Sequence, residues 1–93
     1  MYKCLRIMFR GSLSSSFLRD FIQKSAREFS LEGAAQLLPE EDRISIVVCG
    51  QKDNIDLFLD AFHAHIAAYD IDQVEIEPYM KVKDYRGVFR VID

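Results

Sequence analysis

Two hydrophobic periodicities divide the first third of the chain. Residues 2–10 carry apolar side chains at every second position, which predicts a β-strand with one apolar and one mixed face. Residues 11–16 break this pattern with a glycine and three serines. From Phe17 to Phe29 the apolar positions recur every three or four residues, which predicts an amphipathic helix. One of the two serines before Phe17 is suited to cap its N-terminus.

The rest of the chain predicts a second helix and four more strands. Asp53 is suited to cap this helix, and Pro78 is expected to bend the strand that contains it. The predicted elements are strands at 33–38 and 43–49, a helix at 55–69, and strands at 74–82 and 88–92.

The predicted order β-α-β-β-α-β-β indicates an α+β fold of the ferredoxin-like type, an antiparallel sheet with two helices on one face. Residues 1–93 are expected to form a single domain. Such a fold hosts many unrelated functions. The side chains expected in the core are Leu5, Ile7, Phe9, Ile44, Ile46 and Val48 from the strands, against Phe21, Ile22, Phe58 and Phe62 from the helices.

Composition narrows the function classes. With 49% hydrophobic and 29% charged residues, the chain resembles an ordinary globular protein rather than a disordered one. Its net charge of -3 argues against a nucleic-acid partner, and no apolar run is long enough for a membrane span. Cys4 and Cys49 lie in apolar runs and are expected to be buried free thiols of a cytoplasmic protein, since no signal peptide is visible. The oligomeric state is left open.

The segment from Gly11 to Arg19 is the strongest candidate for chemistry. It joins the first strand to the first helix, where unpaired backbone N–H groups and the helix dipole favour an anion. The guanidinium of Arg19 is suited to two phosphate oxygens at once. The alternative is a solvated helix start with an exposed arginine.

Three other patterns favour ordinary structural roles. His63 and His65 are two residues apart on a predicted helix and point in different directions, so a shared metal is not expected. The acidic residues 40–42 and 70–77 suit a solvated turn and an exposed strand face. Aromatic and basic residues interleave in the first and fourth strands, but the strand at 43–49 lacks the aromatic motif of an RNA-binding sheet.

The loop and the element order resemble the acylphosphatase family. Members of that family carry a first loop of the form G-x-V-Q-G-V-x-F-R, and this chain has G-S-L-S-S-S-F-L-R at residues 11–19. The family segment L-x-G-x-V-x-N lies over residues 31–37. The resemblance covers nearly the whole chain, including the fifth strand.

The resemblance implies hydrolysis of acyl phosphates without a metal or organic cofactor. Its expected ligand is a small phosphorylated molecule or an inorganic anion. The phosphate-binding loop that it implies consists of Ser12, Leu13, Ser14, Ser15, Ser16, Phe17 and Arg19.

Two departures from the family pattern predict a diverged member with a degenerate site. Leu37 stands where the family has the asparagine that positions the attacking water, and its side chain has no hydrogen-bonding group. Ser15 stands where the loop has an internal glycine. Gln36 is a substitute for the asparagine only if a β-bulge turns it to the face of Leu37.

Two functions therefore stay open at the level of sequence. One is weak acyl-phosphate hydrolysis that depends on Arg19, with Gln36 guiding water. The other is a non-catalytic domain that senses phosphate or other anions, or that binds a protein through a sheet edge or an exposed sheet face bearing Tyr2, Met8 and Val47.

Overall fold

The structure is a computed structural model that describes residues 2–10, 18–38, 43–67, 72–80 and 86–92. Of residues 18, 19, 72 and 73 it describes the backbone alone. The elements are β1 (Tyr2–Arg10), the π-helix η1 (Leu18–Gln23), α2 (Lys24–Glu28), β2 (Glu32–Leu38), β3 (Arg43–Gln51), α3 (Lys52–Ile66), β4 (Asp72–Pro78) and β5 (Phe89–Ile92).

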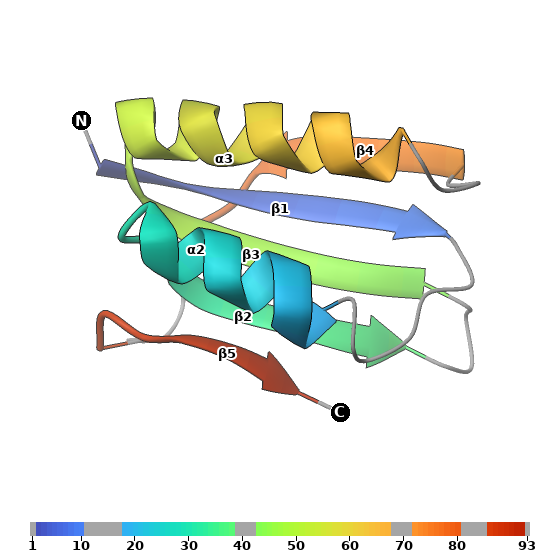
Figure 1. The fold of residues 1–93 in the computed structure, drawn as a ribbon, viewed down its shortest axis with the longest axis horizontal. Coiled ribbons are helices and arrows are strands. Elements are labelled where there is room, and N and C mark those ends of the chain that lie inside the picture. Colours follow the sequence, from blue (N-terminus) through green and yellow to red (C-terminus); the bar gives the residue numbers. More distant parts are fainter. Residues whose placement is uncertain (1, 11–17, 39–42, 68–71, 81–85, 93) are drawn as a thin grey trace.

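The strands form one five-stranded sheet in the order β4-β1-β3-β2-β5, and the helices cover one of its faces (Figure 1). The α+β ferredoxin-like prediction is confirmed. The expectation of an all-antiparallel sheet is wrong for one strand, because β5 runs parallel to β2. The last residue of β4 and the first residue of β5 lie at the same end of the sheet. From this end, β5 runs along the opposite edge in the same direction as β2.

The core lies between this covered face and the helices. The predicted side chains are found there: Ile7, Phe9, Ile44, Ile46 and Val48 are buried against Ile22, Phe58 and Phe62, with Leu5 and Phe21 partly buried at the margin. Burial of each large apolar side chain contributes about 1.5–3 kcal/mol. The opposite face of the sheet carries no described helix; it is called the open face below.

Several predicted boundaries are corrected. The first helix starts as a π-helix, and the cap prediction for Asp53 is wrong, because Gln51 is the N-cap of α3 and Asp53 lies in the first turn. The strand β4 begins at Asp72 and ends at Pro78 instead of bending there, since proline cannot donate to the ladder. The serine caps before the first helix lie outside the described residues.

The prediction of free thiols is also wrong. Cys4 on β1 and Cys49 on β3 are direct cross-strand partners and form a disulfide, so the chain holds no free cysteine. The apolar pattern around each cysteine predicted burial, and both are buried. It carried no information on the strand register, which places the two residues opposite each other.

A polar cluster links three segments of the chain at the end of the sheet that carries the disulfide. The buried carboxylate of Glu32 on β2 accepts a hydrogen bond from the Tyr2 hydroxyl and another from the backbone N–H of Gly87, at 2.6 Å. It therefore links β1 and the turn before β5 to β2. No helix among the described residues is long and apolar enough to span a membrane.

Candidate functional site

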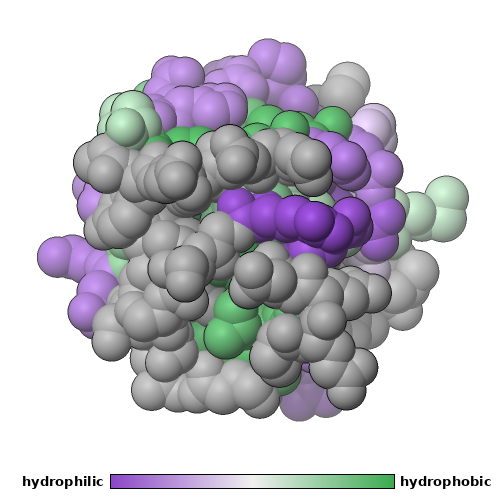
Figure 2. Space-filling view, turned by 90° about the vertical axis from the view of Figure 1, so that its right-hand side faces the viewer, coloured by the Kyte–Doolittle hydropathy of each residue, from purple (hydrophilic) through white to green (hydrophobic). Residues whose placement is uncertain are grey.

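The candidate site lies at the Arg10 end of the sheet, opposite the disulfide. Arg10 at the end of β1 pairs with Arg43 at the start of β3, and Arg43 pairs with Leu38 at the end of β2. The first residue of η1 and the last residue of α3 come to the same end (Figure 1). Figure 2 views the molecule from this end; among the residues that it colours, a hydrophilic row crosses the middle and small hydrophobic areas lie above and below it.

The helix η1 places Arg19 at this end of the sheet. Arg19 is its second residue and the last residue of the predicted phosphate-binding loop. Three contacts fix η1. Ile22 is fully buried in the core, the ring of Phe21 stacks on His65 of α3 at 3.9 Å between centroids, and Gln23 Nε2 donates to the carbonyl of Phe89 at 3.3 Å. The backbone that carries Arg19 is therefore held by both the sheet and α3.

A π-helix at this position is a structural feature that periodicity did not predict. Six residues, from Leu18 to Gln23, form i→i+5 turns instead of α-helical ones. Single π-turns inside helices occur frequently at functional sites. The apolar residues Phe21 and Ile22 satisfy both helix types over so short a segment, so the hydrophobic pattern cannot distinguish them.

The position of the family asparagine faces the helices. Leu37 on β2 is opposite Ile44 on β3 and packs at the margin of the core, on the same face as the buried Ala35. Contacts between β2 and η1 place this strand beside the helix that carries Arg19. The residue at position 37 thus lies on the face of the sheet that the helices, including η1, cover.

The neighbouring Gln36 lies on the other side of the sheet. It is exposed and pairs with Ser45 on the open face. The β2–β3 register runs without a shift from Glu32 to Leu38, so the bulge needed to turn Gln36 toward the face of Leu37 is not present in this ladder. The tentative role of Gln36 in guiding water stays a prediction without that support.

The predicted phosphate cradle itself is not tested by the structure. Residues 12–17 lie outside the described residues, and of Arg19 only the backbone is described. The structure places the two ends of this loop, Arg10 and Leu18, at the same end of the sheet.

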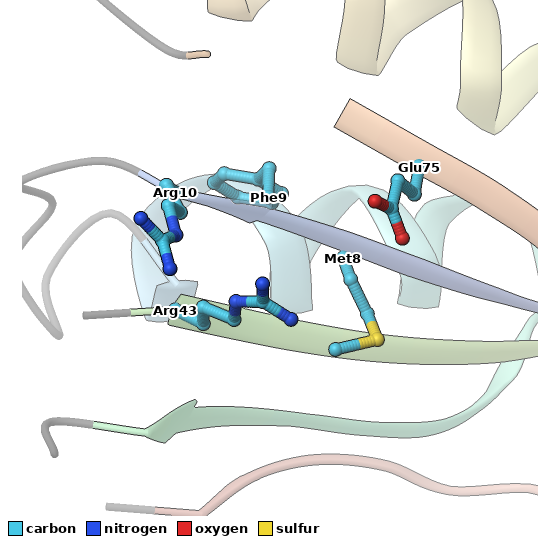
Figure 3. Close-up of a pocket in the computed structure, with 5 residues that line it drawn as sticks. All are labelled: Met8, Phe9, Arg10, Arg43 and Glu75. Carbon is cyan, nitrogen blue, oxygen red and sulfur yellow. The ribbon is translucent and has the colours of Figure 1, made fainter. Parts of the chain in front are cut away.

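Two arginines at this end were not singled out by the sequence. Arg10 and Arg43 line a shallow depression with Met8, Phe9 and Glu75 (Figure 3). Arg10 and Arg43 lie side by side because of the antiparallel register of β1 and β3, which a single sequence does not reveal.

The two histidines of α3 lie in different surroundings. His63 is exposed, whereas the ring of His65 stacks on the ring of Phe21. Among the described residues, no group of three histidine, cysteine or carboxylate side chains is arranged to hold a metal ion.

Among the described residues, a surface pair on α3 has shifted pKa values. A hydrogen bond of 2.8 Å from Lys52 Nζ to Asp56 Oδ2 raises the pKa of Lys52 and lowers the pKa of Asp56. These are i,i+4 partners at the surface, and such pairs contribute little to stability.

Comparison with known proteins decides the family. The model of the acylphosphatase family matches residues 5–91 of this chain. The chain belongs to the acylphosphatase family. A relative named acylphosphatase from Caldivirga maquilingensis is 30% identical over 83 residues, which are 89% of this chain and 87% of the relative.

Solved acylphosphatase structures match over the whole fold. The structure of an acylphosphatase from Coxiella burnetii has a TM-score of 0.78 at 25% identity, covering 98% of this chain and 93% of that one. The crystal structure of acylphosphatase from Bacillus subtilis has a TM-score of 0.79 at 17% identity and is covered completely, as is this chain. The latter similarity supports the fold alone.

Proposed function

We propose that this acylphosphatase-family protein hydrolyses carboxyl–phosphate anhydrides, and that it does so slowly. The observation that carries the proposal is the family match over residues 5–91, which includes the loop and Arg19. The position of η1 beside β2 supports it, because Arg19 and residue 37 then belong to neighbouring elements. The alternative of a non-catalytic sensing or interaction domain gains no specific observation.

In the proposed reaction the chain binds and orients a phosphoryl group. The guanidinium of Arg19 and backbone N–H groups of residues 12–17 bind the phosphoryl oxygens and stabilise their charge in the transition state. The oxygen of water forms a bond to phosphorus while the bond from phosphorus to the acyl oxygen breaks. The products are a carboxylate and inorganic phosphate, and the proton of the attacking water is released to the phosphate or the solvent.

Leu37 accounts for the slow rate. A side chain that only makes apolar contacts cannot orient a water molecule by hydrogen bonding. Correct orientation of a nucleophile is worth several kcal/mol in the barrier, or several powers of ten in rate. We therefore expect binding of the phosphoryl group to be retained while most of the rate enhancement is lost.

The test compares two arginine variants of the purified chain. Acetyl phosphate hydrolysis is measured for the wild type, for Arg19→Ala and for Arg27→Ala, whose exposed arginine on α2 is a matched control. We expect a rate above buffer that Arg19→Ala lowers by about 10²-fold, a usual loss for one oxyanion-stabilising group. Equal rates for all three proteins and for buffer would refute hydrolysis of this substrate.

The cytoplasmic location stays a prediction, without the support that free thiols would have given it.

A further inference from the structure

Three consecutive residues of η1 contact three different parts of the fold. The ring of Phe21 lies nearly parallel to the imidazole of His65 on α3, with 8° between their planes. Ile22 is buried in the core, and Gln23 donates to the carbonyl of Phe89 on β5. Successive side chains leave a helix in different directions. The helix η1 therefore cannot turn about its axis without breaking at least one of these contacts.

The π-helical geometry of η1 depends on such contacts. A helix of six residues is too short to be stable in isolation, and π-turns are rare in any case. If Leu18–Gln23 took α-helical turns instead of i→i+5 turns, the backbone at Arg19 would be rotated relative to the residues that anchor η1. The anchoring contacts thus determine how the backbone at Arg19 is oriented.

The stack with His65 is the contact best placed to control this orientation without disturbing the core. Ile22 belongs to the core that the whole fold shares, and the Gln23 bond of 3.3 Å is longer than the usual N–H···O range. Phe21 is only two residues from Arg19, and its partner His65 is half-buried at the surface. Loss of the imidazole therefore removes a contact of η1 and leaves the core residues in place.

We propose that His65 is a positioning residue, whose ring holds η1 and so keeps the backbone of Arg19 in the orientation that binds a phosphoryl group. The ring acts by stacking on Phe21, and its nitrogens take no part in this role. A small misplacement of a binding group is enough to lower a rate. The positioning of η1 stands on the described contacts alone, whereas its effect on catalysis rests on the proposed function.

Amide hydrogen exchange tests the positioning without turnover. In a π-helix over Leu18–Gln23, the N–H of Gln23 bonds back five residues, so its exchange reports the opening of η1. We expect His65→Gln, which keeps polar groups but removes the ring, to speed this exchange about fivefold, as for the loss of one aromatic pair. His65→Phe should restore slow exchange. His63→Ala, which removes an exposed histidine two residues away, should leave it unchanged.

The amide of Ile46, in the middle of the sheet, is the internal reference. Equal acceleration at Gln23 and Ile46 in His65→Gln would show that the residue only stabilises the fold, and it would overturn the proposal. So would an unchanged exchange rate at Gln23. Fast exchange that persists in His65→Phe would contradict the ring stack as the cause, because only the nitrogens are lost in that variant.

Kinetics then test the effect on catalysis. The value of kcat/KM for acetyl phosphate is measured for the wild type, His65→Gln, His65→Phe and His63→Ala, and for Phe21→Leu alone and combined with His65→Gln. We expect an about fivefold loss in His65→Gln and in Phe21→Leu, no further loss when the two are combined, and no loss in the other two variants.

Losses that multiply in the combined variant would refute action through the stack. An unchanged kcat/KM in His65→Gln would refute an effect on catalysis. If the wild type hydrolyses acetyl phosphate no faster than buffer, the proposed function fails, and the exchange of the Gln23 amide alone decides whether His65 positions η1.

Discussion

Gly33 is the position where the fold tolerates a substitution least. Its φ is 142°, and a Cβ built on it would lie 1.9 Å from the carbonyl oxygen of Val47 on the neighbouring strand. The obstacle is backbone, so no side-chain rotation can relieve it. Gly33→Ala must therefore move β2 away from β3, in the segment that leads to Leu37.

The loss of unfolding free energy in Gly33→Ala follows from the displacement of β2. An ordinary contact needs well over an ångström of additional separation, which breaks or lengthens ladder hydrogen bonds on both sides of the residue. Two such bonds contribute about 1–3 kcal/mol together, and an unfavourable φ adds about 1–3 kcal/mol. The expected loss is about 2–6 kcal/mol, a large fraction of the 5–15 kcal/mol that stabilises a typical domain.

Two other glycines supply matched controls. Gly87 also has a positive φ, 70°, but a Cβ there meets nothing within 4 Å, so Gly87→Ala isolates the backbone term. At Gly50 a Cβ would meet Cδ2 of Leu31 at 2.5 Å, the mobile end of a side chain that can adjust. We expect the cost in unfolding free energy to be largest for Gly33→Ala, with about 1–2 kcal/mol for Gly87→Ala.

The assay is urea unfolding followed by circular dichroism for the wild type and the three variants. Free energies and slopes are compared, since an unchanged slope shows that a shifted midpoint reports stability. If Gly33→Ala loses no more stability than Gly87→Ala, the close approach of β2 to Val47 is wrong. Failure of Gly33→Ala to fold, with both controls folded, agrees with the reasoning.

Two further predictions concern the disulfide and the surface ion pair. The Cys4–Cys49 bridge closes a loop with a sequence separation of 45, for which loop entropy gives about 4 kcal/mol; thermal unfolding of Cys4→Ala/Cys49→Ala should show a markedly lower Tm, and an unchanged Tm refutes the bridge. The hydrogen bond from Lys52 lowers the pKa of Asp56 in the folded protein. The ionised carboxylate therefore stabilises the fold at pH values above the usual pKa of 3.8, and this stabilisation is lost as the pH falls through the lower pKa of the folded state. The Tm difference between wild type and Asp56→Asn should therefore vanish in acid, and a difference that grows there contradicts this.

The fold was predictable because local pattern and long-range packing agree. The alternation that ends at Phe9 and the helical spacing of Phe58 and Phe62 each specify one buried face, and the core unites these faces. What the sequence left unknown depends on register or on backbone detail. The Cys4–Cys49 bridge and the Arg10–Arg43 pair both follow from the β1–β3 register, which alternation alone does not fix.

The candidate site was predictable only through its motif. Arg19 was singled out because it closes a loop that resembles the family pattern, and the structure places it on a π-helix that periodicity did not distinguish from an α-helix. The side on which Gln36 lies required the ladder itself. Physical reasoning from one sequence did not predict that Arg10 and Arg43 lie together on the open face at this end of the sheet.

The substitution Leu37→Asn tests the central claim most directly. Position 37 lies at the margin of the core on the face toward the helices, so asparagine can present its amide there. Hydrolysis of acetyl phosphate is compared for the wild type, Leu37→Asn and Leu37→Ala, the last to separate loss of bulk from gain of an amide. The account predicts that Leu37→Asn raises kcat at least tenfold, that Leu37→Ala does not, and that Arg19→Ala abolishes the gain. No gain in a folded Leu37→Asn protein would contradict it.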